Sequence, residues 1–575
     1  MTTQIPTKPN LPLDIADLTA LANAFFHALP GESVDLALPV NTQAAQAAQL
    51  SVPSTAQLAT QVPAQKHQAQ LPVEPFSFYG DISPQAFGLP TEAQLRALLM
   101  DGPQYGQGLI APAASAPVSS SAVHLPRASQ DPFLHPSARP QHTPGNYYFL
   151  SESGPWSRPQ EHTTPVKTQL DVNAIRKDFP ILAERVNGKP LVWFDNAATT
   201  QKPQVVMDRL NYFYRHENSN IHRAAHELAA RATDAYENAR QTVANFLGAA
   251  SADEIIFVRG ATEAINLLAN TFGERFIQPG DDIIVSQLEH HANIVPWHNL
   301  AERKGAKLKV IPVDDSGQLQ ISALRNLIGP RTKLIAVTQV SNALGTVTPI
   351  EEIIHIAHQA GVPVMVDGAQ AVSHMQVNVQ ALDADFYVFS GHKVFGPTGI
   401  GVLYGKSRWL EQLPHWQGGG NMIADVTFEK ISYQPAPNKF EAGTGNIADA
   451  VGLTSALNYV SSIGLAAINA YEHELLNYAT AGLKTIPGLK LIGTATHKAS
   501  VASFILDGYS TEQVGSKLNE EGIAVRSGHH CAQPILRRMG VETCVRPSLA
   551  FYNTCEEIDR MLSVLNRLAG KNRLY

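Results

Sequence analysis

Residues 362–399 read VPVMVDGAQAV, then a gap long enough for a short helix, and then DFYVFSGHKVFGPTG. The apolar runs Val362–Val366 and Phe386–Phe389 are short and rich in β-branched or aromatic residues, so they predict buried parallel strands of an α/β sheet. Asp367 directly follows the first run, and Lys393 lies in a Ser-, Gly- and His-rich turn after the second. Ligands of open α/β sheets bind beyond the carboxyl ends of the strands, which predicts a binding site here.

An aspartate and a lysine at that edge suit pyridoxal phosphate. Lysine forms a Schiff base with this cofactor, and aspartate pairs with its pyridinium nitrogen. These two residues alone fit a buried ion pair without a cofactor equally well. A second pattern favours the cofactor: the apolar run Ile255–Val258, the turn Arg259–Thr262, and then a helical pattern. Free N–H groups at a helix start bind phosphate, and Thr262 adds a hydroxyl group.

A third motif, RSGHHCAQP at residues 526–534, contains one of the three cysteines of the chain. Cys531 lies in a Gly-, His- and Pro-rich loop beside Arg526, His529 and His530. Cationic neighbours favour the thiolate form of cysteine, so Cys531 is a candidate nucleophile. Cys544 and Cys555 are interpreted as small buried hydrophobic residues.

Together these motifs resemble the cysteine desulfurases, specifically their group II (SufS-like) branch. The compact RSGHHCA loop, with His530 directly before Cys531, is the group II feature. The resemblance covers about residues 170–575. It is carried by FDNAATTQKP (194–203), NSNIHRAAH (218–226), RGATEAIN (259–266), EHHAN (289–293), VDGAQ (366–370), SGHK (390–393) and RSGHHCA (526–532).

The resemblance implies the aspartate-aminotransferase-like α/β fold of fold type I enzymes, which depend on pyridoxal phosphate (PLP). It predicts a desulfurase region at 169–575, with a large domain at about 185–430. The small domain would run from about 431 and include the segment before 185.

The resemblance also implies a role for each matching site residue. Cys531, Lys393 and His290 would be catalytic, with His290 stacked on the pyridine ring. No metal site is expected. The cofactor would be bound by Lys393, Thr262, Asp367, Gln370, Ser390, His392, Asn342, His290 and, across a homodimer interface, Thr444. The substrate would be bound by Arg546, which clamps its carboxylate, and by Arg526, His222, Arg223 and Asn342.

The implied reaction converts L-cysteine to L-alanine and leaves a persulfide on Cys531. An acceptor protein or thiol would then take the sulfur for iron–sulfur cluster supply or for storage. A selenocysteine lyase or another PLP-dependent lyase fits nearly the same motifs. A pure scaffold or cargo protein is disfavoured, because Lys393 and Cys531 are both intact.

The composition excludes several other classes of protein. A net charge of −7 argues against a nucleic-acid-binding protein. No apolar run approaches the roughly 18 residues of a membrane span, and the N-terminus does not resemble a secretory signal. Three cysteines form no disulfide framework. We therefore expect a soluble, cytoplasmic protein that does not bind membranes.

Residues 1–168 differ sharply in composition from the rest of the chain. They hold 22 of the 38 prolines and are rich in Gln, Ala and Ser, which predicts a mostly disordered region. Three islands of apolar residues, at 13–29, 75–105 and 146–156, are typical of motifs that fold against a partner. The alternative is that they dock on the enzyme's own surface.

The N-terminal region resembles the tails of SufS-like desulfurases that are cargo of family 2 encapsulins. That resemblance implies location inside an encapsulin nanocompartment. The alternative is a stand-alone SufS-like enzyme whose tail binds another partner.

Overall fold

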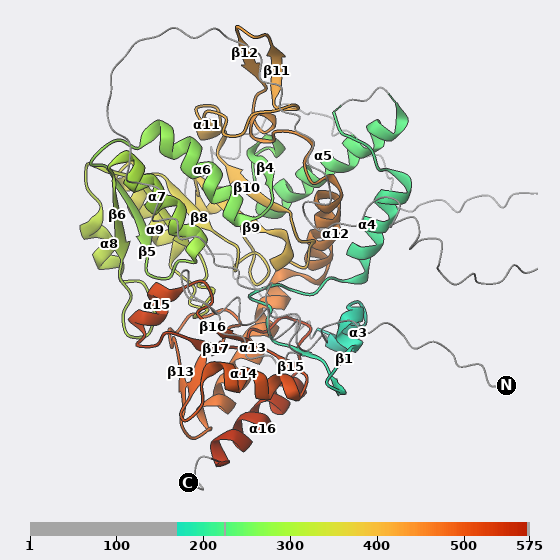
Figure 1. The fold of residues 1–575 in the computed structure, drawn as a ribbon, viewed down its shortest axis with the longest axis vertical. Helices are drawn as coiled ribbons and strands as arrows, with labels where there is room; N and C mark the ends of the chain where they lie inside the picture. Colours follow the sequence, from blue (N-terminus) through green and yellow to red (C-terminus); the bar gives the residue numbers. More distant parts are fainter. Residues whose placement is uncertain (1–169, 223–225, 572–575) are drawn as a thin grey trace, which may run out of the picture. The chain divides into compact units, whose positions relative to one another are not determined.

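The centre of the fold is a seven-stranded sheet with the strand order β4-β10-β9-β8-β7-β5-β6 (Figure 1). The structure is a computed structural model and describes residues 170–222 and 226–571. Strand β10 runs antiparallel to β4 and β9, and the other neighbouring pairs are parallel. The strands are β4 (Ile255–Val258), β5 (Asp282–Ser286), β6 (Lys307–Ile311), β7 (Thr332–Thr338), β8 (Val364–Asp367), β9 (Phe386–Ser390) and β10 (Gly401–Gly405).

The two runs that open the sequence analysis are β8 and β9. They pair in parallel, with Met365 opposite Phe386, so the prediction of neighbouring parallel strands is confirmed. Strand β8 begins at Val364 rather than Val362. The intervening Pro363 has no N–H group to donate to a sheet ladder.

Helices cover both faces of this sheet. Side chains that point to one face, such as Ile256 and Val388, share an apolar cluster with residues of α6 (Ala261–Phe276) and α7 (Val295–Lys304). This two-sided burial explains why the strands are almost continuously apolar in sequence.

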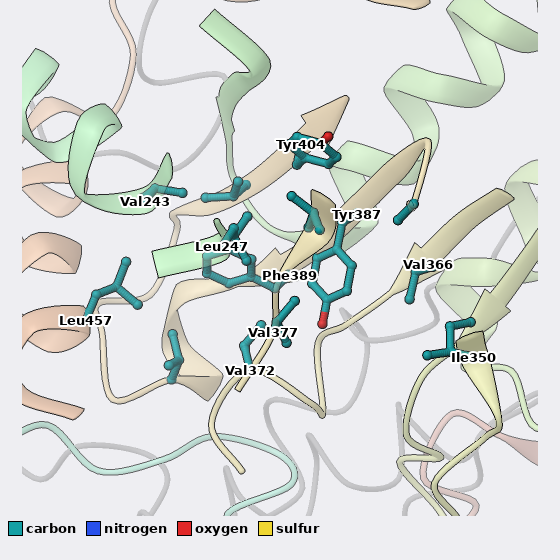
Figure 2. Close-up of a cluster of buried hydrophobic side chains, with 14 of the residues drawn as sticks. Val243, Leu247, Ile350, Val366, Val372, Val377, Tyr387, Phe389, Tyr404 and Leu457 are labelled. Carbon is teal, nitrogen blue, oxygen red and sulfur yellow. The ribbon is translucent and has the colours of Figure 1, made fainter. Parts of the chain in front are cut away.

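The alternate side chains form a second cluster, part of which Figure 2 shows. Val243 and Leu247 come from α5, and Leu457 comes from α12; they pack in the same cluster as Phe389 and Tyr387. The helices on this face are α5 (Glu227–Leu247), α9 (Ile350–Gln359) and α12 (Ile447–Ile463).

A second, four-stranded antiparallel sheet has the order β13-β14-β17-β16. Its apolar cluster includes Phe504, Leu475, Leu518 and Leu565. The strands are β13 (Leu489–Leu491), β14 (Phe504–Leu506), β16 (Arg526–Gly528) and β17 (Cys544–Arg546). The helices in this part are α13 (Leu465–Lys484), α14 (Thr511–Glu520) and α16 (Cys555–Lys571).

Shorter elements connect these two parts. Strand β3 (Val192–Trp193) pairs in parallel with β15 (Ile523–Ala524), and β1 with β2 and β11 with β12 form hairpins. The remaining elements are α3 (Val172–Lys177), η2 (Pro180–Ala183), β1 (Arg185–Val186), β2 (Lys189–Pro190), α4 (Gln204–His216), η3 (Ala252–Glu254), η4 (His291–Asn293), α8 (Ile321–Leu327), α10 (Val379–Leu382), η5 (Gly391–Lys393), α11 (Ser407–Leu410), β11 (Ile423–Val426), β12 (Ile431–Tyr433), η6 (Asn438–Phe440) and α15 (Gln533–Arg538).

In the described part of the chain, no single helix is long and apolar enough to cross a membrane. Only α12 and α13 taken together, with a bend of 75° between them, reach that length and composition.

The predicted domain boundaries near residues 185 and 431 stay a prediction. Val192 and Phe194 belong to the apolar cluster of the four-stranded sheet, whereas α12 packs against α4 and α5. The predicted disordered region at 1–168, with its islands at 13–29, 75–105 and 146–156, lies outside the described residues.

Candidate active site

A cavity of about 200 Å³ lies where residues of the two sheets meet. Strands β8 and β9 end at it, α6 begins at it, and β16 and β17 contribute arginines from the second sheet. Segments far apart in sequence therefore converge on one site. The sequence-predicted residues that line the cavity are Thr262, His290, Asn342, Asp367, Gln370, Ser390, His392, Lys393, Arg526, Cys531 and Arg546.

Asp367 and Lys393 form the buried charged centre of this cavity. Asp367 is the last residue of β8 and is 5% exposed. Burial raises its pKa, while the Ala369 N–H group, 3.0 Å from Oδ1, and the charge of Lys393 oppose that rise. Burial also lowers the pKa of Lys393 to about 8. A neutral amine is therefore accessible near physiological pH, as nucleophilic attack on an aldehyde requires.

The start of α6 forms an anion-binding corner beside them. Gly260 caps the helix, the Ala261 N–H group donates to Ser390 Oγ at 2.9 Å, and Thr262 lies in the first turn. A Cβ atom on Gly401 would lie 2.4 Å from the Gly260 Cα atom, so the close approach of β10 to this turn requires glycine. Free N–H groups and the helix dipole favour a phosphate here.

His392, on the same side of the cavity, has a pKa lowered to about 4 by burial and by the charges of Lys393 and Lys202. It is therefore neutral at physiological pH.

His290 follows β5 and is held by a defined hydrogen bond. Its Nδ1 atom accepts from the Ala292 N–H group at 3.0 Å, which leaves the proton of the neutral ring on Nε2. Burial, followed by the charge of Lys393, lowers the pKa of His290 to about 3. A neutral imidazole on the cavity wall can stack on an aromatic ligand.

The Cys531 loop has an unusual backbone conformation. His530 and Cys531 have φ angles of 52° and 54°, in the left-handed region that costs energy for residues other than glycine. Three hydrogen bonds hold it: the His291 N–H group to the Cys531 carbonyl (2.8 Å), Asn342 Nδ2 to the His530 carbonyl (2.7 Å), and the Cys531 N–H group to His529 Nδ1 (3.1 Å). The half-buried free thiol of Cys531 is thus held at the cavity.

The other cysteines differ from each other. Cys544 is fully buried, as expected, and its sulfur lies 3.2 Å from His530 Nε2. Cys555 is exposed, so the expectation that it is buried is wrong. It is the first residue of α16, where the helix begins at the surface.

Two arginines face each other across the small sheet at the cavity. Arg526 and Arg546 are directly opposite in the β16–β17 ladder, an arrangement of like charges that destabilises a sheet. Arg546 is 1% exposed; its Nη2 atom donates to Asp195 at 3.0 Å and its Nη1 atom to the Asn342 carbonyl at 2.9 Å. Arg526 is half-buried, and the two positive charges at the cavity together suit an anionic ligand.

Three buried polar atoms around the cavity have no hydrogen-bond partner among the described residues: Asn342 Oδ1, His530 Nδ1 and Arg546 Nε. An unpaired buried polar group costs about 1–3 kcal/mol, so these atoms indicate that a polar ligand completes the site. Pyridoxal phosphate and an amino acid fit the residues present. Lys393 would bind the cofactor's aldehyde carbon and Asp367 its ring nitrogen, while Thr262, Ser390 and His392 would hold its phosphate.

Several predicted residues do not line this cavity. His222 is exposed and bonds Asn421 and Glu237, and Thr444 is exposed with its hydroxyl 3.5 Å from Asn220 Oδ1. Arg223 lies outside the described residues. Gln370 lines the cavity, but its amide nitrogen donates to the Ala197 carbonyl at 2.6 Å.

Sequence reasoning also missed site residues. Asp195, the partner of Arg546, lies in the quoted FDNAATTQKP motif, whose position was the only available signal. A second residue that the predictions did not single out is Glu289, which directly precedes His290 and is completely buried, although it does not line the cavity itself. Burial raises its pKa to about 8, and Asn293 Nδ2 and the Thr338 N–H group donate to it at 2.7 and 3.0 Å.

Comparison with known proteins bears on these assignments. The family model described as Aminotransferase class-V matches residues 192–561. The cysteine desulfurase of Synechococcus elongatus is 66% identical over 399 residues, which are 69% of this chain and 64% of that protein's length. The probable cysteine desulfurase 1 of Mycobacterium leprae is 59% identical over 466 residues, which are 80% of this chain and 76% of that protein.

The solved apo structure of the cysteine desulfurase of Thermococcus onnurineus NA1 has a TM-score of 0.67 and 38% identity, over 69% of this chain and 98% of that one. The fold type I architecture expected from the sequence is thereby confirmed, and pyridoxal phosphate is the cofactor of the class. This chain belongs to the class-V aminotransferase family and, within it, to the cysteine desulfurases.

Proposed function

We propose that this protein converts L-cysteine to L-alanine and collects the sulfur as a persulfide on Cys531. The observation that carries the proposal is the convergence of Lys393, Asp367, Arg546 and the free thiol of Cys531 on one cavity. A lyase without a nucleophilic cysteine has no need for a thiol held in a strained loop.

Arg546 is the proposed anchor for the carboxylate of the substrate. Asp195 and the Asn342 carbonyl occupy the Nη2 and Nη1 atoms, but Nε is buried and unpaired. A carboxylate that reaches Nε and the remaining N–H of Nη2 would form the bidentate pair that guanidinium groups favour. Arg526, on the neighbouring strand, adds positive charge to the same region.

When bound, pyridoxal phosphate withdraws electrons from the substrate's Cα–H bond and so weakens the bond between Cβ and sulfur. Lys393, whose pKa is lowered to about 8, is the proposed base at Cα. Asp367 keeps the ring nitrogen protonated. The Cys531 thiolate attacks the substrate sulfur, the Cβ–S bond breaks, and a persulfide forms on Cys531 while the carbon skeleton takes up protons to become alanine.

We further assign the enzyme to group II because the Cys531 loop is compact. Its backbone is hydrogen-bonded to His291 and Asn342, which come from distant segments of the chain. A short loop of this kind does not carry its sulfur far. A persulfide acceptor, either a second protein or a small thiol, must therefore approach the cavity itself.

The test compares Cys531→Ser with Cys544→Ser and Cys555→Ser in the full-length holoenzyme. Cys531→Ser should keep its cofactor and bind cysteine but lose nearly all formation of alanine and sulfide, because only the thiolate step is removed. The two control variants should stay active. Normal cysteine turnover by Cys531→Ser would refute the assignment, and turnover of selenocysteine alone would favour the selenocysteine lyase alternative.

We also propose that the enzyme is a cytoplasmic homodimer. Thr444 supports this, because it is exposed and outside the cavity of its own chain, as expected for a residue that reaches the phosphate of a partner's cofactor. Loss of dimerisation should then remove cofactor affinity, and Thr444→Ala should weaken cofactor binding without changing the oligomeric mass.

Residues 1–168 are the proposed region that targets the enzyme to an encapsulin shell. The sulfur that the enzyme mobilises there would serve iron–sulfur cluster supply or storage. Their proline-rich composition with three apolar islands supports this. The M. leprae relative aligns with 80% of this chain, more than residues 169–575 provide, so part of its similarity lies in this region.

Deletion of residues 1–168 should leave turnover and dimerisation intact but abolish co-purification with a shell. The deleted segment, fused to an unrelated soluble protein, should carry that protein into the shell. Packaging of the truncated enzyme, or its failure to fold, would contradict the proposal.

A further inference from the structure

The carbonyl oxygen of His392 receives an unusual number of hydrogen bonds. Donors come from the Thr200 N–H group at 3.0 Å, Thr199 Oγ1 at 3.1 Å, Thr200 Oγ1 at 3.2 Å and Lys202 Nζ at 3.3 Å. A carbonyl oxygen has two lone pairs, so four donors fully occupy it. The residue whose carbonyl is held in this way directly precedes Lys393.

The segment 199–202 also holds the turn that carries Lys393 at a second point. Thr200 Oγ1 accepts from the Phe395 N–H group at 2.7 Å, on the far side of Lys393. Because the peptide bond between residues 392 and 393 is planar, fixing the His392 carbonyl also fixes the positions of the nitrogen and Cα atoms of Lys393. Residues 199–202 therefore clamp the turn on both sides of the lysine.

Lys202 is an unexpected member of this clamp because it has no counter-ion in the part of the chain that the structure describes. Among the described residues, no carboxylate lies within ion-pair distance of its ammonium group, whose other acceptors are the Thr200 carbonyl and Thr199 Oγ1. Burial lowers the pKa of Lys202 to about 8, and its charge contributes to the lowered pKa of His392. Lys202 is partly buried, and even partial burial of an ammonium without an opposite charge is unfavourable, so a purely structural clamp would be better served by a neutral donor.

We propose that Lys202 is a positioning residue: with Thr199 and Thr200 it fixes the His392 carbonyl, sets where Lys393 enters the cavity, and adds positive charge beside the phosphate site. The proposal rests on the assignment of Lys393 and His392 to the cofactor. It predicts that the clamp governs how firmly the cofactor is held, which is separate from the sulfur chemistry at Cys531.

Lys498 supplies a matched control. Burial also lowers its pKa to about 8, its Nζ atom donates to a backbone carbonyl (Gly493, 2.6 Å), and it does not line the cavity. Lys202→Met and Lys498→Met thus remove equivalent ammonium groups, one at the clamp and one elsewhere. The pair Thr200→Val and Thr200→Ser tests the clamp without a change of charge, because serine retains the hydroxyl group.

The measurement is the rate at which full-length holoenzyme loses pyridoxal phosphate, followed by its visible absorption in the absence of cysteine. Lys202→Met and Thr200→Val should release it at least tenfold faster than the unmodified enzyme, and Thr200→Ser and Lys498→Met should stay within twofold. In turnover assays, Lys202→Met should lower kcat and leave KM for cysteine within threefold.

Release from Lys202→Met within twofold of normal, or equally fast release from Lys498→Met, would overturn the proposal. If Lys202→Met does not fold, the Thr200 pair decides the matter. Because release is measured without substrate, its outcome does not depend on whether the protein is a desulfurase.

Discussion

Removing the charge of Asp195 should both destabilise the protein and weaken substrate binding. The change is Asp195→Asn, which keeps the shape of the side chain and one acceptor oxygen. It leaves the guanidinium group of Arg546, whose side chain is 2% exposed, without its carboxylate partner at 3.0 Å. Arg526 lies directly opposite on the next strand, so the remaining positive charges face each other.

The size of the effect follows from burial. At an effective dielectric constant of about 20, unit charges about 4 Å apart interact by about 4 kcal/mol, and breaking a buried ion pair costs about 3–5 kcal/mol. Two features reduce this cost. Water screens part of the interaction, because the Asp195 side chain is 21% exposed, and burial raises the pKa of Asp195 despite the opposing charge of Arg546. We therefore expect a loss of about 2–3 kcal/mol in the free energy of unfolding, and an increase of about tenfold in KM for cysteine.

Urea unfolding of the holoenzyme at a fixed cofactor concentration measures the first effect, and alanine formation measures the second. Glu352→Gln is the control, because the Arg325–Glu352 pair is exposed (54% and 49%) and 3.3 Å apart. Its loss should cost less than about 0.5 kcal/mol. If Asp195→Asn is no less stable than Glu352→Gln, the buried pair does not have the importance that we assign to it.

Two further predictions concern protonation and the cofactor. The pKa of His530 is lowered to about 3 in the folded protein, so as the pH falls through 6.5 only the unfolded chain takes up a proton at this residue and stability falls. Between pH 6.5 and 5 this costs about 1.6 kcal/mol, and urea unfolding of His530→Gln at the two pH values should show a correspondingly smaller loss. Lys393→Ala should lose the visible absorption band of lysine-bound pyridoxal phosphate, whereas Lys498→Met should keep it; an unchanged band in Lys393→Ala would mean that another lysine binds the cofactor.

Local patterns in the sequence predict the positions of several residues of the cofactor site. The end of a parallel strand is defined by where an apolar run stops, so Asp367 and the turn that holds Lys393 could be placed at one sheet edge before the structure was known. The same holds for Thr262, since a strand, a glycine turn and a helix start are contiguous in sequence. The residues around Cys531 already made it a candidate nucleophile, whereas the role of Arg546 came only from the family resemblance.

Features that depend on the approach of distant segments were not predictable in this way. Asp195 and Arg546 are 351 residues apart, and only the packing of the two parts of the fold makes them an ion pair. The left-handed backbone at Cys531 and the exposure of Cys555 likewise have no signature in residue type. The sequence by itself determined the chemical groups at the strand ends and at the helix start, such as Asp367, Lys393 and Thr262, because those features are local. Tertiary structure alone decided which groups are paired, unpaired or buried, because each of these depends on atoms contributed by another part of the chain.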